Sequence, residues 1–215
     1  SLGYAAQDRN IFDIVNQFNR CLSYFDSKKD RLELMKMNLQ AGKKAKLTSS
    51  FSQALDYFNI VIQIIESNRQ EWDANVVFEV YLEAGEAAYL KSDFVSGVMF
   101  YESALKYATT DFQKARVHHN FLVMYNGVSD MEASWKSGLK ALHFLGEKFP
   151  THVSKLKVLQ QYSRVKWMMR GVEPKSLLDR PEIEDQEAEQ LLLTLMEMIA
   201  AAWDKTPETL GYIVL

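Results

Sequence analysis

The stretch from Ala41 to Lys44 (AGKK) is the first place where residue types suggest chemistry. A glycine followed by a lysine ends the loops that hold nucleotide phosphates. Such a loop also needs an upstream glycine to turn its N–H groups inward and a Ser or Thr after the lysine to reach magnesium, and neither is present. We therefore expect no nucleotide site here and interpret Gly42 as a residue that lets two helices approach closely.

The histidines and the single cysteine also lack the partners that chemistry would need. Zinc sites combine several His, Cys or carboxylate ligands, and the four histidines have no Cys partners. His118 and His119 point to different sides of a helix, so we expect one packed and one solvated imidazole. Cys21 lies on an apolar stripe and is expected to be buried and unreactive. The sequence predicts no catalytic residue, no cofactor and no metal, and hence a segment that is not itself an enzyme.

Composition and charge exclude several classes of partner. The 215 residues include 25 basic and 28 acidic side chains spread along the chain, so no basic stripe for nucleic acid is evident. No apolar run approaches the roughly 20 residues that cross a bilayer, and the first residues lack a secretory pattern. With a single cysteine as well, we expect a cytoplasmic protein that binds neither nucleic acid nor membrane.

Apolar residues recur at spacings of three and four along nearly the whole chain, which predicts helices. Small and aromatic positions repeat after 43 residues, as in Gly42 and Gly85 or Phe51 and Phe94, and then after 37, as in Ala104 and Ala141. Tetratricopeptide repeats are helix pairs of this kind, in which small residues let two helices approach and large ones fill the space between pairs. The expected fold is an all-α, right-handed solenoid of antiparallel helix pairs with degenerate repeats.

The expected organisation has three parts. Residues 1–29 form a leading helix, residues 30–149 form three helix-pair repeats, and residues 150–215 form further divergent helices of the same solenoid. The last part includes helices from Thr151 to about Arg170 and from about Glu184 to Trp203, and Thr206-Pro207 begins one more. Ser50 with Gln53, and Ser129 with Glu132, have the spacing of a capping box at a helix start. The apolar ending at Leu215 is interpreted as a truncation of a longer chain.

A repeat stack presents a groove lined by the first helix of each pair. Projecting the positions that face away from the partner helix gives a mixed-charge groove: Lys36, Lys43, Lys46, Glu79, Glu86, Tyr89, Arg116, His119 and Asn126. This arrangement differs from the clamps that hold a peptide carboxylate. The predicted partner is a protein or peptide, or a neighbouring domain of the same chain.

Several stretches together resemble the helical segment of very large hybrid signalling proteins: Ile11–Arg20 (IFDIVNQFNR), Ala41–Lys46, Val80–Tyr89, Val165–Gly171 and Leu177–Ile183. Proteins of that family have, in order, a serine/threonine-kinase-like domain, an AAA-type ATPase, a tetratricopeptide-like region, a GAF domain and often a sensor histidine kinase. The resemblance implies a segment that follows an ATPase and precedes sensory and output domains.

Three functions remain open at this point. The chain is expected to be an interaction or scaffold segment of such a multidomain ATPase and kinase protein. It could instead be a rigid spacer that couples the ATPase to the output domains without an external ligand. Regulators that combine an ATPase with a DNA-binding tail have a similar middle segment, so the parent could also be a transcription regulator.

Overall fold

The computed structural model describes residues 2–21, 24, 27–67, 72–150, 152–173, 176 and 183–215, with the side chains of the first helix described from Ile11 onward. These residues form helices and turns, and no strand occurs among them. The chain divides into two compact units, Ser1–Thr109 and Thr110–Leu215. Among the described helices, none combines the length and the apolar character that crossing a bilayer requires. The all-α prediction is confirmed.

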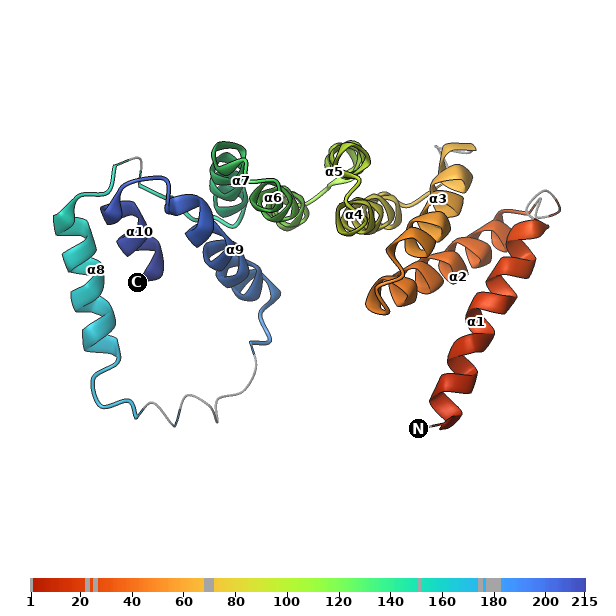
Figure 1. The fold of residues 1–215 in the computed structure, drawn as a ribbon, viewed down its shortest axis with the longest axis horizontal. Helices are drawn as coiled ribbons and strands as arrows, with labels where there is room; N and C mark the ends of the chain where they lie inside the picture. Colours follow the sequence, from red (N-terminus) through yellow and green to blue (C-terminus); the bar gives the residue numbers. More distant parts are fainter. Residues whose placement is uncertain are drawn as a thin grey trace. The chain divides into compact units, whose positions relative to one another are not determined.

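The first unit begins with α1 (Leu2–Arg20), which packs on α2 (Lys28–Leu47). Two helical hairpins follow, α2 with α3 (Phe51–Ser67) and α4 (Ala74–Leu90) with α5 (Phe94–Tyr107) (Figure 1). The second unit starts with a third hairpin, α6 (Asp111–Gly127) with α7 (Met131–Phe144). Among the described residues, three pairs of consecutive helices thus form hairpins.

The same turn closes all three hairpins. Ser49, Ser92 and Ser129 each adopt a positive φ, of 59°, 68° and 60°, and they are 43 and 37 residues apart. In each turn the serine N–H donates to a carbonyl three residues back, and the next N–H donates to one five residues back. This pattern satisfies carbonyls at the helix end that have no partner within the helix. The spacings of 43 and then 37 residues seen in the sequence thus recur in the positions of these turns.

Replacing Ser92 with glycine is expected to stabilise the first unit by roughly 0.5–1 kcal/mol. Glycine adopts a positive φ without the steric cost that a Cβ imposes, and it is the usual residue at this position of a helix end. Urea denaturation would measure the change. The matched control Ser103→Gly, inside α5, should lose about 0.5 kcal/mol because glycine disfavours a helix interior more than serine does. A loss of stability in Ser92→Gly would contradict the account of the turn.

The predicted capping boxes are wrong at both positions. Gln53 donates from its side chain to the Tyr57 hydroxyl, 3.1 Å away. At the third hairpin, Ser129 is the positive-φ turn residue, and Asp130 caps α7 by accepting from the Ala133 N–H. The spacing of Ser129 and Glu132 therefore placed the cap of this helix one residue too early. A capping box does occur at the start of α6, between Thr110 and Gln113.

Glycine and an aromatic ring hold the first two hairpins together. A Cβ on Gly42 would lie 2.4 Å from Phe58 Cε1, and one on Gly85 would lie 2.4 Å from Tyr101 Cδ1. In both hairpins the ring comes from the second helix, 16 residues after the glycine. Both rings are almost fully buried. The prediction that Gly42 is a close-packing residue is confirmed.

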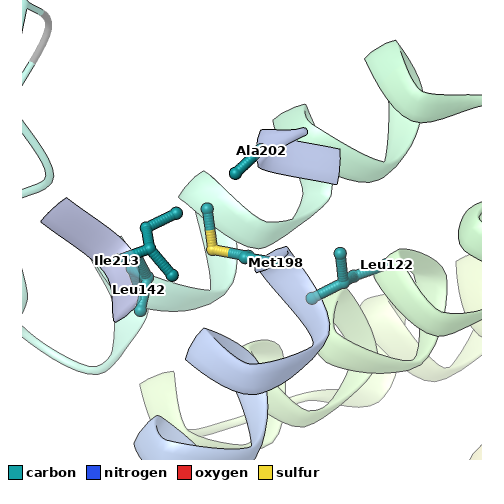
Figure 2. Close-up of a cluster of buried hydrophobic side chains, with 5 residues drawn as sticks. All are labelled: Leu122, Leu142, Met198, Ala202 and Ile213. Atoms are coloured by element: carbon teal, nitrogen blue, oxygen red, sulfur yellow. The ribbon is translucent and has the colours of Figure 1, made fainter. Parts of the chain in front are cut away.

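The third hairpin exchanges the large and small residues. Thirty-seven residues after Gly85 and Tyr101 stand Leu122 on α6 and Gly138 on α7. A Cβ on Gly138 would lie 2.5 Å from Met198 Cγ, so α9 (Gln186–Ala202) packs closely at this glycine. Figure 2 shows Leu122 and Met198 in one apolar cluster with Leu142, Ala202 and Ile213. In the third hairpin the glycine thus leaves room for Met198 of α9, where in the first two it leaves room for a ring of the same hairpin.

The rest of the second unit surrounds α10 (Pro207–Val214), which contacts both α9 and α8 (Lys155–Met168) (Figure 1). The predicted helix from Thr151 begins later because Ser154 caps α8 by accepting from the Lys157 N–H. Thr206 caps α10 with Pro207 in its first turn, as predicted. Residues 177–182 of the stretch that carried part of the resemblance lie outside the described residues.

Cys21 is exposed, so the prediction that it is buried is wrong. The apolar stripe on which it was placed stops one residue earlier, because α1 ends at Arg20 and Cys21 lies in the following turn. Side-chain periodicity applies only while the helix continues.

Candidate functional site

Four charged side chains connect α2 and α4 of the first unit. Lys46 Nζ lies 2.6 Å from a carboxylate oxygen of Glu83 and 2.6 Å from one of Glu86, and Lys43 Nζ lies 3.2 Å from Glu83. We call these four residues the α2–α4 ion cluster. The two positive and two negative charges balance, so the cluster has no net charge with which to attract a small anion or cation.

Burial divides the cluster into an inner and an outer pair. The side chains of Lys46 and Glu83 are 15% and 13% exposed, whereas those of Lys43 and Glu86 are 44% and 42% exposed. Burial alone would lower the pKa of Lys46, but its hydrogen bonds to Glu83 and Glu86 outweigh that effect, and the pKa is raised. The inner pair therefore stays charged and holds the two helices, while the outer pair faces solvent.

The other predicted groove residues of this unit lie on the same two helices. Lys36 is exposed and pairs with Glu33 one turn earlier on α2, with 3.2 Å between Nζ and Oε1. Glu79 is half-buried on α4. The Tyr89 ring packs near Phe94, with centroids 6.0 Å apart. Glu83 was missed by the sequence argument, although its position between Glu79 and Glu86 on one helix face was a usable signal.

In the second unit, helix α9 covers part of the predicted groove face of α6. His119 Nδ1 lies 3.2 Å from Thr194 Oγ1 on α9. The Asn126 side-chain amide donates to the Glu197 carbonyl, 3.0 Å away, and Asn126 Oδ1 accepts from the Ser134 hydroxyl at 2.6 Å. Arg116 is half-buried on the same helix. His119 and Asn126 are thus engaged with an element of their own chain.

The two adjacent histidines are both packed, so the prediction that one is solvated is wrong. His118 is buried, and its ring stacks on Phe144 with centroids 5.6 Å apart. Burial, with a smaller contribution from Lys140, lowers the pKa of His118 to about 4. Burial also lowers the pKa of His119, and the Glu197 carboxylate opposes that effect. Both imidazoles are therefore neutral at pH 7, and His119 is packed because α9 covers the face that was expected to meet solvent.

Within the described ranges, no three His, Cys, Asp or Glu side chains converge in a way that could hold a metal ion. The groups that do converge there are ion pairs between helices and the His118 ring stacked on Phe144.

Comparison with known proteins gives one similarity. No family model matches the chain, and no solved structure matches it. A stretch of 111 residues is 30% identical to part of the hybrid signal transduction histidine kinase G of Dictyostelium discoideum. The similarity covers 47% of this chain and 3% of that much longer protein. The chain is thus similar to a segment of a signalling protein.

Proposed function

We propose that this chain is a tetratricopeptide-type interaction segment of a multidomain signal-transduction protein. It binds a partner protein, or a neighbouring domain, against the face formed by α2 and α4. The observation that supports it most is the repetition of one hairpin, with the same serine turn in all three and the same glycine–aromatic contact in the first two. Repeated helix pairs of this kind present extended surfaces to other proteins.

The signalling context comes from the similarity to the hybrid histidine kinase. In this proposal the segment has no catalytic role of its own and the parent's chemistry is done by other domains. The proposal places the segment in the cytoplasm. The mixed charge of the face favours a protein partner with charges of both signs over nucleic acid.

The outer residues of the face are the ones that would contact the partner. The side chain of Lys36 is 62% exposed, and Lys43 and Glu86 are both more than 40% exposed. The inner Lys46 and Glu83 keep α2 and α4 together, so the face is already formed before a partner arrives. A preformed surface loses less entropy when it binds.

Reversing the outer lysines tests the proposal. The variant Lys36→Glu/Lys43→Glu is expected to weaken capture of the parent's flanking domains, supplied as separate proteins, by at least about tenfold, or 1.4 kcal/mol. Repulsion would replace attraction where the partner presents carboxylates. Titration by biolayer interferometry would measure the change.

The matched control is Lys91→Glu/Lys106→Glu, which reverses two exposed lysines outside the predicted face. Lys91 ends α4, and Lys106 lies on α5. Its affinity should equal that of the unmodified chain. Equal affinity for all three proteins, or no binding at all, would refute the groove and leave a rigid spacer as the better description.

A further inference from the structure

Helix α8 presents an apolar stripe to solvent. Leu156, Leu159 and Trp167 are 63%, 59% and 75% exposed, and their spacing of three and eight residues keeps them on one side of the helix. The opposite side contacts α10, where Val158 lies near Gly211. Three large apolar side chains on one exposed face, in helical register, are typical of a surface that another element covers.

Every charged residue on α8 is basic. Lys155, Lys157, Arg164 and Lys166 lie along the helix, and Arg170 follows its end. No Asp or Glu occurs from residue 148 to residue 172. The stripe on α8 is therefore suited to bind an apolar surface that is bordered by carboxylates.

Helix α9 has such a surface on the side turned away from α6 and α7. Leu192, Met196 and Trp203 are 47%, 58% and 76% exposed and lie on one face. Glu189 continues that face toward the helix start, and Asp185 caps the helix there. The stripe on α9 is thus acidic where it begins and apolar further along.

We propose that α8 of one copy of this chain packs antiparallel on α9 of a second copy. An antiparallel alignment sets Arg170 opposite Asp185, Lys166 opposite Glu189, Ser163 opposite Leu192 and Leu159 opposite Met196. Within the helices the steps are three and four residues, which is the spacing by which two helices interlock along a shared seam, and Arg170 and Asp185 lie just beyond the helix ends. Arg170 and Lys166 each meet an acidic residue, and the exposed Leu159 meets the exposed Met196.

A second copy accounts for both stripes at once. An anionic lipid surface would suit the basic α8 but would repel the carboxylates of α9. In a two-fold arrangement each copy supplies one α8 and one α9, so the contact forms twice. This surface is separate from the α2–α4 face, and the inference does not rest on the proposed function.

Charge reversal with mixing tests the pairing. Sedimentation equilibrium of the whole chain is expected to show a reversible dimer. Lys166→Glu and Glu189→Lys, each alone, should weaken it at least tenfold, because like charges then face each other. An equimolar mixture of these two variants should dimerise as the unmodified chain does, because every contact in the mixed dimer is complementary.

Leu159→Asp should abolish the dimer, and circular dichroism would show that its helices are retained, since Leu159 is largely exposed. The control Lys106→Glu should leave the dimer unchanged. The proposal is overturned if the unmodified chain stays monomeric at 100 µM, on the order of a weak interface. It is also overturned if the mixture fails to restore pairing, or if the chain binds phosphatidylserine vesicles without associating with itself.

Discussion

Replacing Gly85 with leucine is expected to lower the free energy of unfolding of the first unit by about 3 kcal/mol. Even a Cβ at this position would lie 2.4 Å from Tyr101 Cδ1 and Cε1 and 3.2 Å from Cγ. The Tyr101 ring is 1% exposed and has no free space into which to turn. Overpacking of this kind costs up to about 3 kcal/mol, because α4 and α5 must separate. Urea denaturation followed by circular dichroism would measure the loss.

A double change supplies the control for this prediction. Gly85→Leu/Tyr101→Gly removes the ring with which the new leucine side chain would clash. The double variant should therefore be more stable than the sum of the single changes by at least about 1 kcal/mol. Strictly additive losses would show that these two positions do not interlock.

Acid is expected to destabilise the second unit through His118. The pKa of His118 is about 4 in the folded chain and about 6.5 when the chain is unfolded. Between these values the unfolded state binds more protons, so stability rises with pH across this window and is lost as pH falls from 6.5 to 4. The expected loss from this residue is about 3 kcal/mol. Denaturation at a series of pH values would measure it.

The variant His118→Phe separates this effect from the titration of carboxylates. Phenylalanine keeps the stacking on Phe144 but cannot be protonated. Its stability should fall less between pH 6.5 and pH 4, by the amount that His118 contributes. Identical pH profiles for both proteins would mean that His118 is protonated in the folded chain at little cost.

The sequence was enough to predict the hairpins because their interlocking residues are local. Gly42 and Phe58 lie only 16 residues apart, and the same pair recurs 43 residues later as Gly85 and Tyr101. The helix starts near Ser50 and Ser129 were placed within two residues, but the capping boxes predicted there are absent. A serine in the left-handed conformation, such as Ser129, has the same composition signal as a serine that caps a helix.

The candidate site was predictable in part for a similar reason. Lys43, Lys46 and Glu86 follow from helical projection, and their ion pairs join neighbouring hairpins. The packing of α9 on His119 and Asn126 was not predictable. Its contacting residues, Thr194 and Glu197, lie more than 70 residues away along the chain. Nothing in the spacing of α6 indicates which later helix will pack on it, since that depends on the path of the connection between them.

Lysine labelling followed by mass spectrometry tests the central claim, that the α2–α4 face binds a partner. The rates at Lys36, Lys43 and Lys106 would be compared in the isolated chain and in the intact parent protein. We expect Lys36 and Lys43 to be labelled several times more slowly in the parent, while Lys106 on α5 keeps the same rate. Unchanged rates at Lys36 and Lys43 would contradict the claim.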